Sequence, residues 1–110
     1  MIDADDLIAL VQNYNPKTNA KLIADAYDYG MAMHEGQFRH SGEPYWSHPV
    51  AVAAILTEQQ LDDSTIVTAL LHDTIEDTRS TYKEVSETFS PEIAELVDSN
   101  PRNDEIKNIG

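Results

Sequence analysis

Apolar residues recur at intervals of three and four along most of the chain, the spacing that places them on one face of a helix. The clearest stripe consists of Leu22, Ile23, Ala26, Tyr27, Gly30 and Met33. The pattern predicts helices over residues 5–14, 17–35, 49–60, 64–77, 81–89 and 91–97. No segment shows the convincing period of two expected of a half-buried strand. The sequence therefore predicts an all-α protein, a compact bundle of about six helices.

Several helix ends carry their own signals. Thr81 and Glu84 form a capping box, and Ser90-Pro91 combines an N-cap with a first-turn proline. Gly36 is expected to end the long second helix as its C-cap. The polar stretch 37–47 then reads as an ordered loop.

The fourth predicted helix differs from the others in how much of its surface is apolar. Asp62-Asp63-Ser64 supplies its N-cap. Apolar side chains then cover more than half of its circumference. We therefore expect it to be the central and most buried helix.

Composition narrows the classes of function. The chain has 110 residues, 41% of them hydrophobic, which suits one domain with a single modest core. Twenty acidic residues against seven basic ones give a net charge of −13, which argues against binding to nucleic acid or to an anionic membrane surface. The absence of cysteine excludes disulfides and thiolate chemistry. No apolar run approaches the roughly 20 residues of a membrane span, so a cytoplasmic location is expected.

The strongest candidate for chemistry is the segment His72–Asp77, at the end of the apolar helix. Helical spacing would place Glu76 one turn from both His72 and Asp73, so that carboxylates and an imidazole converge. A solvated helix end is the alternative. An adjacent imidazole and carboxylate suit Mn²⁺, Fe²⁺ or Zn²⁺, and His48, at a helix start, is the best further ligand.

Two other side chains leave alternatives open. His34, at the end of the second helix, can be a ligand or a core or capping group. Arg39 is the only Lys or Arg between Lys21 and Arg79. It can be a surface ion-pair partner or the group that meets a phosphate or a base.

Three motifs together resemble one family. They are HEGQFRHSGEPY at residues 34–45, SHP at 47–49 and ALLHDTIEDT at 69–78. The combination resembles the N-terminal hydrolase domain of RelA/SpoT-type enzymes, within the HD metal-dependent phosphohydrolase superfamily. The resemblance covers roughly residues 17–98.

The resemblance implies an all-α, metal-dependent enzyme that hydrolyses the 3′-pyrophosphate of the alarmone (p)ppGpp to GDP or GTP and pyrophosphate. One divalent ion, typically Mn²⁺, would be bound by His48, His72 and Asp73. Glu76 and Asp77 match the acidic pair that activates or orients the attacking water. Arg39, His40 and Ser41 match the loop that meets the guanine nucleotide. His40 replaces a frequent Lys, which would make the local positive charge pH-sensitive.

The sequence also departs from the family pattern. A downstream Asp that completes the family's metal site, as a fourth protein ligand, is absent from this chain, and the match breaks at Ser99-Asn100-Pro101. These departures predict a C-terminally truncated HD domain over residues 1–98, a divergent polar tail over 99–110, and weak or lost activity. An apolar face left exposed would favour a homo-oligomer. The alternative function is a non-catalytic remnant that oligomerises or senses nucleotides.

Overall fold

The computed structural model describes residues 1–99, and this part of the chain is built from helices. They are α1 (Ala4–Tyr14), α2 (Ala20–Met33), α3 (Ser47–Glu58), α4 (Asp63–Leu71), α5 (Thr74–Asp77), α6 (Tyr82–Thr88) and α7 (Pro91–Ser99). The only β-type pairing among the described residues is an isolated bridge between Phe38 and Pro44. The all-α prediction is confirmed. The predicted tail lies outside the described residues apart from Ser99, so the domain boundary stays a prediction.

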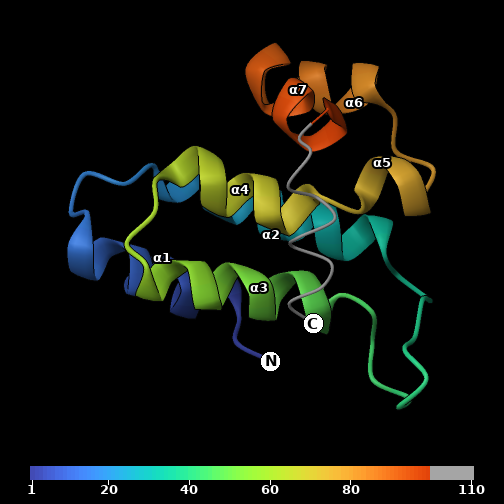
Figure 1. Cartoon of the computed structure of the whole chain (residues 1–110), viewed down its shortest axis with the longest axis horizontal. Coiled ribbons are helices and arrows are strands. Elements are labelled where there is room, and N and C mark those ends of the chain that lie inside the picture. The colour runs from blue at the N-terminus through green and yellow to red at the C-terminus, as the bar shows by residue number, and fades with distance from the viewer. Residues whose placement is uncertain (100–110) are drawn as a thin grey trace.

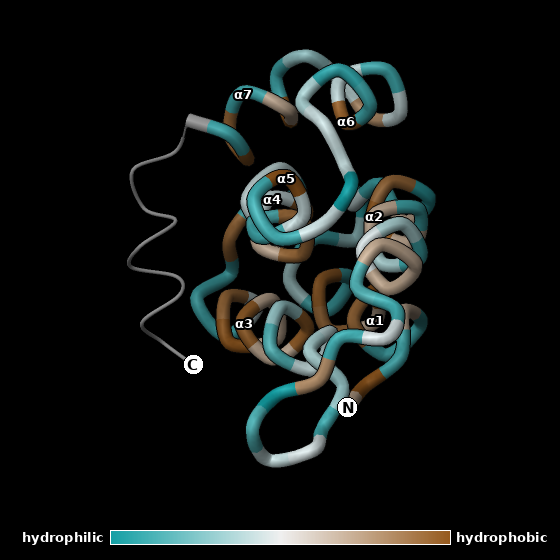
Figure 2. The backbone as a smooth tube through the Cα atoms, turned by 90° about the vertical axis from the view of Figure 1, so that its right-hand side faces the viewer, coloured by the Kyte–Doolittle hydropathy of each residue, from teal (hydrophilic) through white to brown (hydrophobic). Residues whose placement is uncertain are grey.

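Helix α4 lies at the centre of the bundle, as predicted. Every residue from Ile66 to Leu71 is buried, and the helix contacts α2, α3 and α7. Figures 1 and 2 show α2 and α3 flanking α4, with α6 and α7 on the remaining side. Burial of four large aliphatic side chains in this one helix supplies a large share of the apolar area removed from water. The C-terminal half of α4, which leads into His72 and Asp73, thus lies within the core.

The predicted start signals of three helices are confirmed. Asp62 accepts a hydrogen bond from the Thr65 amide (3.0 Å) at the start of α4. The hydroxyls of Thr81 and Ser90 accept bonds from the Glu84 and Ile93 amides at α6 and α7 (3.1 and 3.0 Å). These bonds satisfy amides that have no partner within a first helical turn.

The capping box at α6 is confirmed only in its Thr81 half. The Glu84 carboxylate accepts a hydrogen bond from the Tyr29 hydroxyl of α2 at 3.0 Å. The acidic side chain therefore ties α6 to α2 across the bundle. A capping box that sequence analysis missed joins Asp3 and Asp6 at the start of α1.

The prediction of one continuous helix over residues 64–77 is wrong. Helix α4 ends at Leu71, and α5 is a separate turn that begins at Thr74. At this break, side chains bind carbonyls that backbone amides would bind if α4 continued. His72 Nδ1 binds the Ala69 carbonyl (2.5 Å), and the Thr74 hydroxyl donates to the Leu71 carbonyl (2.7 Å). Such local bonds compete with the helical ladder.

The second helix ends earlier than predicted. Its last residue is Met33, His34 is the C-cap, and Gly36 follows with φ +83°. The predicted loop over 37–47 ends at Trp46, the N-cap of α3. Two backbone hydrogen bonds order it, from Arg39 N to Glu43 O and from Tyr45 N to Gln37 O, each 2.8 Å. Gly42, with φ +89°, makes the tight turn at the tip.

Trp46 anchors the end of this loop against α2. A Cβ atom on Gly30 would lie 2.3 Å from the Trp46 ring, so only glycine permits this packing. Tyr27 meets the same ring edge-on, with centroids 5.4 Å apart. The contact fixes the start of α3, and with it the position of the residues that follow Trp46.

The surface of the described residues carries few large apolar side chains, and they lie on different elements. Leu10, Met31, Phe38, Ile55 and Tyr82 belong to α1, α2, the loop, α3 and α6, respectively. No helix among the described residues is long and apolar enough to cross a membrane. The predicted oligomer stays a prediction.

Candidate metal centre

His48, His72 and Asp73 come together in the interior, as the sequence predicted. His48 lies in the first turn of α3, while His72 and Asp73 form the break between α4 and α5. One donor atom from each lies within 4.8 Å of the others, and all three side chains are buried. Of the described residues, only this set forms such a cluster. The fold therefore assembles a three-ligand set from two segments more than 20 residues apart.

The hydrogen bonds of His72 determine which nitrogen can bind a cation. The Ala69 carbonyl can only accept, so Nδ1 carries a ring proton, and Nε2 is the nitrogen that is left to bind a cation. His72 Nε2 is buried, has no hydrogen bond, and lies 3.2 Å from Asp73 Oδ2. With His72 neutral, a nitrogen lone pair faces a carboxylate oxygen at short range. A bound cation resolves this arrangement, so the residues present fit a divalent metal ion.

His48 supplies a third donor in the form that metals bind. Burial lowers the pKa of His48, and the neighbouring His72 lowers it further. The rings of the two histidines lie with centroids 5.9 Å apart. A lowered pKa favours the neutral imidazole, whose free nitrogen can coordinate a metal.

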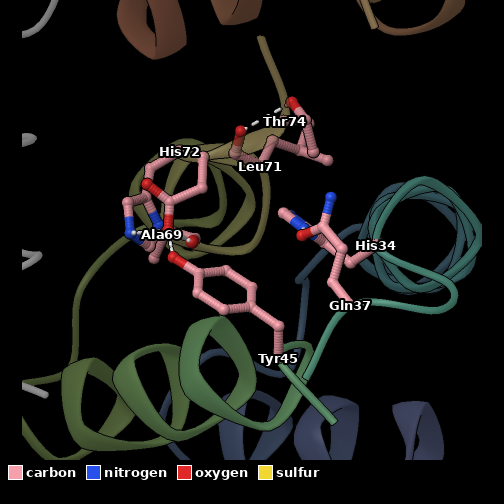
Figure 3. Close-up of polar contacts among 8 residues, drawn as sticks. His34, Gln37, Tyr45, Ala69, Leu71, His72 and Thr74 are labelled. Carbon is pink, nitrogen blue, oxygen red and sulfur yellow. Dashed lines mark hydrogen bonds and ion pairs between the residues drawn. The ribbon is translucent and has the colours of Figure 1, made fainter. Parts of the chain in front are cut away.

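Tyr45 supports the carboxylate of Asp73, a role that sequence analysis did not assign. Its hydroxyl donates a hydrogen bond to Asp73 Oδ2. Burial and the carboxylate together raise the pKa of Tyr45, so that the hydroxyl keeps its proton and remains a donor. Figure 3 shows Tyr45 reaching from the start of α3 toward His72 at the end of α4. The position of Tyr45, one helical turn before His48, is the signal that could have revealed it.

The acidic pair Glu76 and Asp77 does not enter the buried cluster. Both side chains are exposed on α5, and of the three carboxylates in the segment only Asp73 is buried. The predicted convergence assumed an unbroken helix, but the chain leaves the helix after Leu71 and resumes it only at Thr74. The pair therefore lies at the surface, next in sequence to the candidate metal ligands.

Arg39, His40 and Ser41 are exposed in the loop between α2 and α3. Together with Phe38 and Tyr45 they line a groove of about 620 Å³. Tyr45 belongs to both the groove and the metal centre, because its hydroxyl reaches Asp73. A molecule in the groove would thus lie next to the residue that supports a metal ligand.

His34 is a buried structural residue rather than a member of the ligand cluster. Its Nδ1 lies 2.9 Å from Gln37 Oε1, and its ring packs between Tyr45 and Trp46. Figure 3 shows His34 and Gln37 side by side at the end of α2. The sequence left open whether His34 is a metal ligand or a core or capping residue, and the structure supports the second interpretation.

The chain is similar to a known domain family and to curated proteins. The HD domain family matches residues 26–109. GTP pyrophosphokinase rsh of Brucella melitensis is 53% identical over 93 residues, which are 84% of this chain and 12% of the relative. The bifunctional (p)ppGpp synthase/hydrolase SpoT of Escherichia coli is 47% identical over 103 residues, 94% of this chain and 15% of the relative. A Shigella flexneri guanosine-3′,5′-bis(diphosphate) 3′-pyrophosphohydrolase gives the same values. The chain thus spans less than a sixth of the length of each of these relatives.

Proposed function

Because the chain belongs to the HD domain family, as its motifs indicated, we propose that it hydrolyses the 3′-pyrophosphate of (p)ppGpp in a metal-dependent reaction. The products would be pyrophosphate and GDP or GTP, released in the cytoplasm. The observation that carries the proposal is the buried pair of His72 Nε2 and Asp73 Oδ2, 3.2 Å apart beside His48. The printed names of two relatives support the choice of substrate, since both refer to hydrolysis of this nucleotide class.

His48, His72 and Asp73 would hold one divalent ion, for which Mn²⁺ is proposed. When bound, the ion supplies Lewis acidity toward a phosphoryl oxygen and lowers the pKa of water nearby. The fixed Nδ1 proton of His72 keeps its ring oriented, and the Tyr45 hydroxyl holds one oxygen of Asp73 in place. The protein's own contribution is thus a rigid set of donors.

Glu76 and Asp77 would accept or steer the proton of the attacking water. Their carboxylates lie on the turn directly after the metal ligands and are open to solvent. An exposed carboxylate can take a proton as the water oxygen bonds to phosphorus, while the bond from phosphorus to the nucleotide's 3′ oxygen breaks and that oxygen takes up a proton from solvent. The position of the pair beside the buried cluster supports this role.

Arg39, His40 and Ser41 would bind the nucleotide in the groove they line with Tyr45. The Arg39 guanidinium can pair with phosphate oxygens or stack on the base, and the Ser41 hydroxyl can hydrogen-bond to either. A local positive charge matters here because the net charge of −13 repels an anionic substrate. His40 would add to it only when protonated.

The test is pyrophosphate release from ppGpp by the purified chain, with and without Mn²⁺. We expect Mn²⁺-dependent release that Asp73→Asn abolishes. The matched control is Asp63→Asn, which makes the same change at the other end of α4, outside the cluster. Glu76→Gln should reduce release while sparing Mn²⁺ binding.

A helical, folded chain that binds Mn²⁺ but releases no pyrophosphate would contradict the proposed activity. That result would favour the alternative, a non-catalytic HD-domain module that senses nucleotides or oligomerises. Loss of Mn²⁺ binding in Glu76→Gln would instead overturn the role given to Glu76.

A further inference from the structure

Gln37 links three segments that surround the metal centre. Its backbone amide donates to the His34 carbonyl at 3.0 Å, and its carbonyl accepts from the Tyr45 amide at 2.8 Å. Its side chain lies 2.9 Å from His34 Nδ1 and donates to the Asp77 carbonyl at 2.8 Å. One residue thus connects the end of α2, the start of α3 and the end of α5.

The orientation of the Gln37 amide follows from its partners. The Asp77 carbonyl can only accept, so it must receive the bond from Nε2. Oε1 is then left to accept a bond from His34, which places the His34 ring proton on Nδ1. His34 is fully buried, and its ring packs against Tyr45 and Trp46. The Gln37 side chain is therefore bound to a residue that the core holds in place. The amide has one orientation that satisfies both neighbours.

Helix α5 needs this support because it is too short to be stable without contacts to the rest of the protein. It consists of four residues, and isolated helical turns of that length are unstable in water. The Asp77 carbonyl at its end is one of those that a helix leaves without an amide partner. The Gln37 side chain supplies a donor to that carbonyl from outside the helix.

We propose that Gln37 is a positioning residue, which holds the α5 turn and its acidic pair in register with the loop that carries Arg39. The bond from Gln37 to Asp77 fixes the end of the turn that bears Glu76 and Asp77. The backbone pairing of Gln37 with Tyr45 fixes the loop only two residues before Arg39. The consequence for catalysis rests on the proposed function, while the mechanical link does not.

The variant that isolates the link is Gln37→Glu. A carboxylate can still accept from His34 Nδ1, but it has no proton to donate and repels the Asp77 carbonyl. The control is Gln12→Glu, which adds the same charge at an exposed position on α1, at the other side of the molecule (Figure 1). Gln37→Met, of similar size, removes both side-chain bonds without adding charge.

The first readout is amide hydrogen exchange in the full chain. The Asp77 and Thr78 amides, which bond to the Asp73 and Thr74 carbonyls within α5, should exchange about five- to tenfold faster in Gln37→Glu. The Leu70 and Leu71 amides in α4 should stay within about twofold of wild type, as should all amides in Gln12→Glu. Unchanged exchange at Asp77 and Thr78, or uniform acceleration across all helices, would overturn the proposal.

A second readout separates this proposal from the proposed function. Mn²⁺ affinity should change less than about threefold in Gln37→Glu, because the side chain of Gln37 bonds to His34 and Asp77, which lie outside the three-residue cluster. If wild type binds no Mn²⁺, the proposed function fails while the exchange result still tests the link. If wild type hydrolyses ppGpp, kcat should fall about tenfold or more with KM nearly unchanged. A change in KM alone would contradict the positioning role.

Discussion

The two ends of helix α4 carry similar residues in opposite environments. At its start, Asp62 accepts a bond from the Thr65 amide (3.0 Å), and Asp63 accepts bonds from the Asn19 amide (2.9 Å) and the Thr18 hydroxyl. At its end, Asp73 is fully buried with an oxygen 3.2 Å from Nε2 of His72. The exposed carboxylates at the start meet amide and hydroxyl donors, whereas the buried carboxylate at the end meets the Tyr45 hydroxyl and the His72 ring.

The difference distinguishes a structural carboxylate from a functional one. At a helix start, amide protons and the positive end of the macrodipole stabilise a negative charge. At a helix end, carbonyl oxygens disfavour it, and burial adds a desolvation cost. A carboxylate retained in the second setting needs a compensating positive charge. The burial of Asp73 at the end of α4, beside two histidines, therefore marks it as a candidate metal ligand, whereas Asp62 and Asp63 serve the structure.

The largest difference between the two ends of α4 is expected when one carboxylate is removed at a time. In wild type, Mn²⁺ at 100 times its Kd should add about 2.7 kcal/mol to the free energy of unfolding. Asp73→Asn should abolish that gain. Losing a supporting residue weakens metal affinity roughly 10- to 100-fold, and losing a ligand should weaken it more. Asp63→Asn should keep it. Thermal denaturation with and without Mn²⁺ measures both, and an equal loss in the two variants would refute the distinction.

The next largest effect is expected from the support of the ligand. Tyr45→Phe removes the hydroxyl that donates to Asp73 and leaves the ring in place. The Kd for Mn²⁺ should rise about 10- to 100-fold, because the carboxylate loses its orienting bond. Isothermal titration measures it. Tyr14→Phe serves as the matched control, since its hydroxyl donates to the Leu61 carbonyl near the start of α4. Equal Mn²⁺ affinity in the two variants would count against a role for Tyr45.

At the start of α4, loss of the cap should affect stability alone. Asp62→Ala removes the acceptor for the Thr65 amide and should lower the free energy of unfolding by about 1 kcal/mol. Mn²⁺ affinity should not change. Urea denaturation and titration of the same protein check the two halves. Weaker Mn²⁺ binding in this variant would show that the two ends are coupled rather than independent.

The smallest effect concerns alkaline pH. Burial raises the pKa of Tyr14 above its usual 10, and the charges of Asp63 and Asp62 raise it further. Above pH 10 the unfolded chain loses this proton while the folded chain keeps it, so stability falls as pH rises through this range. Tyr14→Phe should make this fall of the free energy of unfolding with pH shallower. Identical slopes in urea denaturation at pH 9 to 11 would contradict this.

Local chemistry determined the features that the sequence predicted well. Thr81, Ser90 and Asp62 cap helices through bonds that span three residues, so their effect depends on neighbours in the chain. The apolar stripe of α4 likewise follows from spacing alone. His48, His72 and Asp73 were identified from residue types and their resemblance to a family pattern, and the structure brings them together.

The tertiary structure decided what depended on partners distant in sequence or on competition for the same carbonyl. The helix breaks after Leu71 because the side chains of His72 and Thr74 take carbonyls that backbone amides would otherwise bind, and spacing cannot show which partner prevails. Tyr45 reaches Asp73, and Gln37 reaches Asp77, across separations of 28 and 40 residues. The sequence by itself determined the helical class of the fold, several helix starts and the candidate ligand set. Only packing decided their burial and their supporting bonds, because both depend on which segments the core brings together.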